Sequence, residues 1–142
     1  MILISMVTAM LVSSCGCACD KKVSGPDEIV AEMQEGLDMI TSNDLHVMMD
    51  SLEIFYLIDV REMTEYAYGY IPGAINIPLG VLIFKMGNEA FWEQEMMYPP
   101  EMTDKMIVYC KKGKRSVMAA HYLKRLGYPN VYYIDGGWKA WE

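Results

Sequence analysis

The residue best suited to carry out chemistry is Cys110, which follows the apolar run from Met106 to Tyr109. Four positive charges lie within the next five residues, at Lys111, Lys112, Lys114 and Arg115. Nearby cations favour the thiolate form of a cysteine, and the thiolate is the nucleophile. Because the chain as a whole carries a net charge of −7, this cluster opposes the general acidity. The segment predicts a nucleophilic cysteine inside an anion-binding loop.

Gly113 lies in the middle of this loop, where a backbone with positive φ is readily adopted. Such a turn lets successive N–H groups point inward and form a concave anion site facing the cysteine sulfur. The helix expected from Ser116 to Leu126 would aim its free N–H groups at the same place. The residues expected to bind substrate are Lys111, Lys112, Gly113, Lys114, Arg115 and Ser116.

Two other interpretations of this segment are open. Cys110 could be an inert buried thiol beside solvated lysines, since free cysteine is among the most buried residue types. The chain could also be a cysteine phosphatase or arsenate reductase, whose loop surrounds an oxyanion. A phosphate cradle has five residues between cysteine and arginine, whereas only four separate Cys110 from Arg115. Loop length therefore favours sulfur over phosphate.

The elements that must position this loop form an alternating pattern. Apolar runs at 55–60, 106–109 and 131–134 predict strands that are covered on both faces. Helical stretches are expected between them, at 64–68, 79–97 and 116–126. Strands alternating with helices indicate an α/β fold with a mostly parallel central sheet flanked by helices on both faces. Ligands bind beyond the carboxyl ends of such strands, where Cys110 is expected.

Several ordered motifs over Thr41 to Trp141 resemble the rhodanese homology domain. They are Leu57-Ile-Asp-Val-Arg61-Glu62, Gly69-Tyr-Ile-Pro-Gly-Ala-Ile-Asn-Ile-Pro78, the loop Cys110 to Ser116, and Asp135-Gly-Gly-Trp-Lys-Ala-Trp141. Tyr70 stands where the family pattern usually has histidine. The resemblance implies a rhodanese-like fold with about five strands.

The resemblance also implies a reaction, that of a thiosulfate sulfurtransferase. Cys110 would take the outer sulfur of thiosulfate or a similar anionic donor, releasing sulfite and leaving a persulfide. A thiol or cyanide acceptor would then remove that sulfur, and no cofactor or metal is implied. The partners expected are thus a small anionic donor and a thiophilic acceptor; any protein acceptor is unknown. A different function is a membrane-tethered sulfur carrier or redox relay with little turnover.

Asp59 and Arg61 lie at the end of the first expected strand and are interpreted as loop-supporting residues. Asp59 could orient the active-site loop by accepting backbone N–H bonds. Arg61 could pair with Glu65 or with another carboxylate beneath it. We expect both to serve the scaffold rather than the reaction.

The N-terminal residues 1–19 carry no charge and resemble a signal peptide with a bacterial lipobox ending at Cys15. We expect lipidation of Cys15 and a tethered protein at the cell envelope of a bacterium, periplasmic or otherwise extracytoplasmic. A cytoplasmic protein with an unprocessed tail is the alternative. Residues 20–40 are expected to be a spacer with a short helix from Asp27, and residues 41–142 the rhodanese-like domain. The acidity of the chain argues against a nucleic-acid partner.

Overall fold

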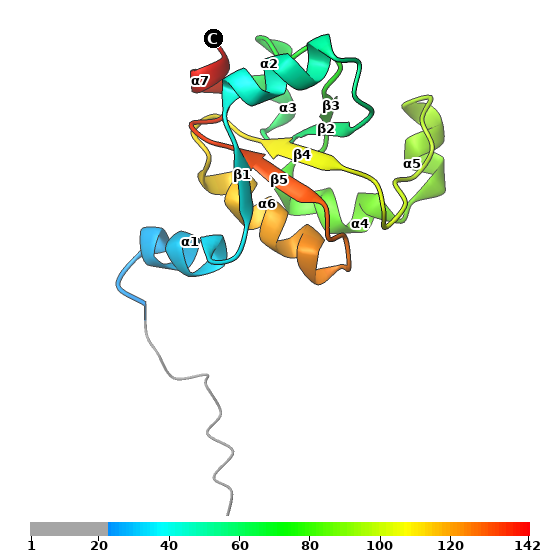
Figure 1. The fold of residues 1–142 in the computed structure, drawn as a ribbon. Coiled ribbons are helices and arrows are strands. Elements are labelled where there is room, and N and C mark those ends of the chain that lie inside the picture. The colour runs from blue at the N-terminus through cyan, green and yellow to red at the C-terminus, as the bar shows by residue number, and fades with distance from the viewer. Residues whose placement is uncertain (1–22) are drawn as a thin grey trace, which may run out of the picture.

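A computed structural model of the chain describes residues 23–142 (Figure 1). The predictions for the signal segment 1–19 and for lipidation of Cys15 lie outside these residues. Among the described residues, no helix is both long and apolar enough to cross a membrane.

One parallel sheet forms the centre of the fold (Figure 1). Its strands lie in the order β1-β5-β4-β2-β3, and every neighbouring pair is parallel. The strands are β1 (Asp38–Ile40), β2 (Tyr56–Asp59), β3 (Ile75–Asn76), β4 (Met106–Tyr109) and β5 (Val131–Ile134). All four residues of β4 are buried, as expected for a central strand with both faces covered. The sheet therefore brings the carboxyl ends of β2 and β4 to one edge.

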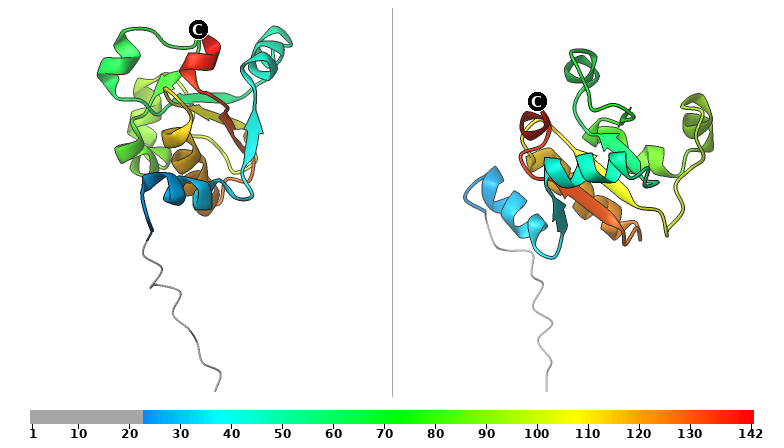
Figure 2. Two further views of the ribbon diagram at one scale, coloured as in Figure 1. Left: turned by 90° about the vertical axis from the view of Figure 1, so that its left-hand side faces the viewer. Right: turned by 45° about the horizontal axis from the view of Figure 1, so that its top comes forward.

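Helices cover both faces of this sheet (Figure 2). On each face, a cluster of buried side chains lies between the sheet and its helices. One face packs against α1 (Pro26–Gln34), α4 (Leu82–Met86), α5 (Glu89–Gln94) and α6 (Lys114–Arg125). The other packs against α2 (Ser42–Asp50), α3 (Met63–Ala67) and α7 (Trp138–Trp141). The prediction of an α/β fold with a parallel five-stranded sheet is confirmed.

The stretch 79–97, expected to be helical, is divided into short pieces. A 3-10 turn, η1 (Leu79–Val81), leads into α4, which ends at Gly87. Asn88 then begins α5, because its side chain accepts a hydrogen bond from the N–H of Phe91 at 3.1 Å. Glycine followed by a capping residue favours such a break.

Residues 23–40, the described part of the segment 20–40 that was expected to be a spacer, contribute structure to the domain. The helix expected from Asp27 is present as α1, and it packs against α6. Val30, Met33 and Leu37 contact the main core cluster. Residues 38–40 form β1, which pairs with β5 at the edge of the sheet. The folded unit thus begins before Thr41, because this segment buries apolar side chains and adds a strand.

Candidate active site

Cys110 lies in the turn between β4 and α6, at the carboxyl edge of the sheet. Cys110 is only 2% exposed to solvent. The backbone N–H of Gly113 donates a hydrogen bond to Sγ of Cys110, with a nitrogen–sulfur distance of 3.2 Å. Gly113 has φ of +99°, a value that glycine adopts without strain. The turn therefore supplies a backbone donor to the sulfur, in the manner that the sequence predicts.

Ser116 holds the loop from within. Its side chain is fully buried, and its hydroxyl donates to the carbonyl of Gly113 at 2.7 Å. The same carbonyl accepts the N–H of Val117 at 3.0 Å. The hydroxyl of Ser116 therefore fixes the turn that carries the sulfur, and binding of substrate by Ser116 stays a prediction.

The segment after β5 closes over the other side of the loop. The N–H of Trp138 donates to the carbonyl of Cys110 at 2.8 Å, and that of Lys139 donates to the carbonyl of Lys111 at 3.2 Å. At Gly137 an added Cβ would lie 2.2 Å from the carbonyl oxygen of Cys110, so only glycine allows this approach. The sequence does not predict this contact, since Gly137 and Cys110 lie far apart along the chain.

Two of the four loop cations are neutralised within the fold. Arg115 donates to both carboxylate oxygens of Glu65, at 2.6 and 2.9 Å. This bidentate bond lowers the pKa of Glu65 from 4.5 to about 2. Lys114 pairs with Asp27 of α1 at 2.5 Å, where both side chains are largely exposed. Neither partner could be assigned from the sequence, because each lies at least 50 residues away.

The other two cations, Lys111 and Lys112, are exposed and form no ion pair within residues 23–142. A cavity of about 230 Å³ opens at the loop, lined by Cys110, Lys111, Lys112, Lys114 and Arg115. The structure thus brings the predicted nucleophile and all four predicted cations to one cavity. Within residues 23–142, Lys111 and Lys112 are the two of these four cations without an ion pair, so their charge is available to an anion.

Asp59 and Arg61 form a buried pair beside the loop. Arg61 donates to both oxygens of Asp59, at 2.6–3.0 Å, and also to the carbonyl of Gly69 at 2.7 Å. Asp59 also accepts the N–H of Arg61 itself at 2.9 Å. The expectation that Asp59 bonds to the loop backbone is therefore wrong. Of the two partners expected for Arg61, Glu65 is wrong because it pairs with Arg115, whereas another carboxylate is confirmed, since that carboxylate is Asp59.

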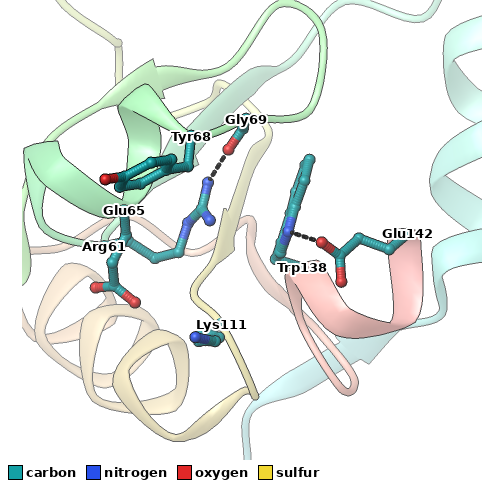
Figure 3. A pocket seen from close by; sticks show the side chains of 7 residues that line it. All are labelled: Arg61, Glu65, Tyr68, Gly69, Lys111, Trp138 and Glu142. Atoms are coloured by element: carbon teal, nitrogen blue, oxygen red, sulfur yellow. Dashed lines mark hydrogen bonds between the residues drawn. The ribbon is translucent and has the colours of Figure 1, made fainter.

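Arg61 also connects the buried pair to a second cavity beside the loop, of about 280 Å³ (Figure 3). The guanidinium carbon of Arg61 lies 4.9 Å from the ring centroid of Trp138. The Arg61 side chain stands between Trp138 and Tyr68 (Figure 3). The indole N–H of Trp138 donates to Glu142 at 2.7 Å. The lining residues are Arg61, Glu65, Tyr68, Gly69, Lys111, Trp138 and Glu142. Because Lys111 lines both cavities, they adjoin at the active-site loop.

Tyr70, the departure from the family pattern, stacks on Tyr66 with ring centroids 4.2 Å apart. The hydroxyl of Tyr66 donates to the carbonyl of Ala74 at 2.7 Å. The change to tyrosine therefore adds aromatic packing between α3 and the following loop. Tyr70 is not among the residues that line either cavity at the active-site loop.

The site has a buried cysteine at the end of a strand, an N–H donor to its sulfur, and a cationic loop that precedes a long helix. These features are typical of an α/β domain that can hold an anion beside a cysteine. Comparison with known proteins identifies the family. The Rhodanese-like domain family matches residues 41–142. The chain belongs to that family, and the resemblance seen in its motifs is confirmed.

Relatives of the chain include named sulfur-transfer proteins. It is 37% identical over 88 residues to "Putative thiosulfate sulfurtransferase, mitochondrial" of Schizosaccharomyces pombe, covering 61% of this chain and 62% of the relative. It is 34% identical over 93 residues to "Putative sulfur carrier protein YrkF" of Bacillus subtilis, covering 66% of this chain and 44% of the relative. The chain thus spans less than two thirds of the length of these two relatives.

Solved structures agree with the fold. The human single-domain sulfurtransferase TSTD1 superimposes with a TM-score of 0.68 at 30% identity, covering 75% of this chain and 96% of that one. A Rhodopseudomonas palustris protein titled a possible tyrosine phosphatase gives a TM-score of 0.70 at 25% identity, covering 85% of this chain and 92% of that one. The family and its named relatives support a sulfurtransferase or sulfur-carrier role for this chain.

Proposed function

We propose that the chain is a thiosulfate sulfurtransferase that carries sulfur as a persulfide on Cys110. The observation that carries this proposal is the N–H of Gly113 directed at Sγ from 3.2 Å, beside a cavity lined by the positively charged Lys111 and Lys112. A backbone donor and nearby cations stabilise negative charge on sulfur, both on the thiolate and on the persulfide.

In the first step, the Cys110 thiolate attacks the outer sulfur of thiosulfate. A bond forms between Sγ and that sulfur, the S–S bond of thiosulfate breaks, and sulfite leaves with the electron pair. Lys111 and Lys112 attract the dianionic donor, while the turn at Gly113 holds the anionic sulfur. In the second step, a thiol or cyanide removes the outer sulfur and restores the thiolate.

The test is thiocyanate formation from thiosulfate and cyanide, together with mass spectrometry of the loaded protein. We expect a mass increase of one sulfur atom, mapped to the Cys110 peptide, and steady turnover. Cys110→Ser should lose both, and Lys124→Ala, a lysine far along α6, should keep both. Absence of any persulfide on Cys110 of the wild type, with thiosulfate and with other sulfane donors, would contradict the proposal.

A sulfur-carrier function is the second candidate, favoured by the 2% exposure of Cys110. A persulfide on a residue this buried is expected to pass its outer sulfur only slowly to small acceptors in solution. The carrier predicts a persulfide that forms once and persists in the presence of cyanide, whereas the enzyme predicts many turnovers. A phosphatase is disfavoured, since Arg115 is engaged by Glu65 and the loop is one residue shorter than a phosphate cradle.

We propose a tether at the cell envelope through a lipid on Cys15. The support is the uncharged segment 1–19 with small residues before that cysteine. Growth with a palmitate analogue should label the wild type, and Cys15→Ala should remain unlabelled. A wild type that stays unlabelled and soluble in the cytoplasm would contradict this proposal.

A further inference from the structure

The second cavity, beside the active-site loop, has walls that differ from those of the sulfur site. The cavity at Cys110 carries only positive formal charge besides the cysteine. The second cavity combines cations, carboxylates and two aromatic side chains around about 280 Å³ (Figure 3). It is therefore built for a ligand other than a small dianion.

Most of its charges are already committed to the protein. Arg61 is held by Asp59 and by the carbonyl of Gly69, and both oxygens of Glu65 are held by Arg115. These groups shape the wall without offering net charge.

Two charges remain for a ligand, one of each sign. Lys111 is exposed and forms no ion pair within residues 23–142. Glu142 is exposed, and one of its oxygens accepts the indole N–H of Trp138 at 2.7 Å. Its other side-chain oxygen has no partner among residues 23–142. The ring of Trp138 stands between the guanidinium of Arg61 and this carboxylate (Figure 3).

We infer that this cavity binds the sulfur acceptor, and that the acceptor is a small thiol with an amino-acid head group. The carboxylate of the ligand pairs with Lys111, its ammonium pairs with Glu142, and its aliphatic part lies against Trp138 and Tyr68. Since Lys111 lines both cavities, a ligand held there lies where this cavity meets the one at Cys110. This inference rests on the proposed function, because it requires a persulfide on Cys110.

The transfer step balances without an added oxidant or reductant. The acceptor thiol loses its proton to solvent, and its thiolate attacks the outer sulfur of the persulfide. A sulfur–sulfur bond forms on the acceptor, while the bond between that sulfur and Sγ of Cys110 breaks. The electron pair returns to Sγ, which becomes the thiolate again. The acceptor leaves as a persulfide.

The experiment uses four thiols of similar size and different charge. They are cysteine, which carries both groups, cysteamine, which carries only the ammonium, 3-mercaptopropionate, which carries only the carboxylate, and neutral 2-mercaptoethanol. Protein loaded beforehand with persulfide is mixed with each thiol, and loss of the persulfide is followed in a single turnover. Comparing each variant with the wild type cancels the intrinsic reactivity of the thiols.

Glu142→Gln should slow transfer to cysteine and cysteamine about fivefold and leave the other two thiols unchanged, as loss of a partly exposed ion pair predicts. Lys111→Ala should slow transfer to cysteine and 3-mercaptopropionate by a similar factor. The matched control is Glu93→Gln, an exposed carboxylate on α5, which should change none of the four rates.

Equal effects of Glu142→Gln on all four thiols, or no effect on cysteine, would overturn the acceptor site. Such a result leaves the proposed function standing, since the protein has already been loaded with persulfide. If the wild type cannot be loaded at all, the proposed function fails first, and the acceptor site fails with it.

Discussion

The two halves of the active-site loop carry equal formal charge but differ in what that charge can do. On the first half, Lys111 and Lys112 are exposed and without ion pairs in the described chain, 23–142. On the second, Lys114 and Arg115 pair with Asp27 and with Glu65. A count of the charges along the sequence therefore overestimates the positive charge that is available to bind a substrate. The first half is available to bind ligands, and the second fastens the loop to its surroundings.

The largest expected effect comes from a glycine that lies against the backbone of the loop. Gly137→Ala would bring a Cβ to 2.2 Å from the carbonyl of Cys110, at a φ of +60° that alanine rarely adopts. We expect a loss of at least about 3 kcal/mol in the free energy of unfolding. Equilibrium unfolding of wild type and variant in denaturant measures this loss of stability. Gly80→Ala, where an added Cβ meets nothing within 4 Å, is the control.

The next effect tests the first half of the loop. If thiosulfate is the donor, as proposed, replacing both Lys111 and Lys112 by alanine should lower kcat/KM for it about a hundredfold, since the cavity at Cys110 loses two cations that form no ion pair within residues 23–142. The free energy of unfolding should hardly change, because both side chains are exposed. A fall of less than about threefold in the steady-state thiocyanate assay would contradict the division of the loop.

Glu65→Gln tests the fastening of the second half. It removes the bidentate partner of Arg115, and we expect a loss of about 1 kcal/mol in the free energy of unfolding near neutral pH. Because the folded-state pKa of Glu65 lies near 2 and its ordinary value is 4.5, this stabilisation is complete above pH 4.5 and disappears as the pH falls towards 2. Melting temperatures of wild type and variant should therefore converge in acid. If the difference in melting temperature between wild type and variant stays constant down to pH 2, the ion pair of Glu65 with Arg115 is not the source of that difference.

The smallest effect is expected at the exposed pair. Lys114→Ala should change kcat/KM for thiosulfate less than threefold and the free energy of unfolding by less than about 0.5 kcal/mol, because a solvent-exposed ion pair contributes little. A loss as large as that of the double lysine variant would mean that Lys114 leaves Asp27 to bind substrate. The same assay and the same unfolding measurement decide between these results.

The sequence predicted the central strands because their apolar runs are continuous. The runs at 55–60, 106–109 and 131–134 contain β2, β4 and β5. It did not predict β1 or β3, since β3 has only two residues and β1 is a half-exposed edge strand of three. Such short elements depend on their neighbours in the sheet, and their own residues carry little pattern.

For the active site, the sequence predicted what lies within one continuous segment. The cysteine, the glycine turn and the four cations are adjacent in the chain, so their assembly needs only a strand, a turn and a helix. The contact of Gly137 with Cys110 and the pairing of Arg115 with Glu65 depend on how distant segments pack. Two carboxylates near Arg61 left its partner open, and only the packed structure selects Asp59.

The bonds from Trp138 and Lys139 to the loop carbonyls also bear on the order in which the fold forms. The strand, the turn and the helix that carry Cys110 are neighbours in sequence and form from local contacts, whereas these two bonds join segments far apart along the chain. Closing that longer loop costs more conformational entropy, so we expect the two bonds to form after the turn itself. The last step in shaping the loop is therefore the docking of α7.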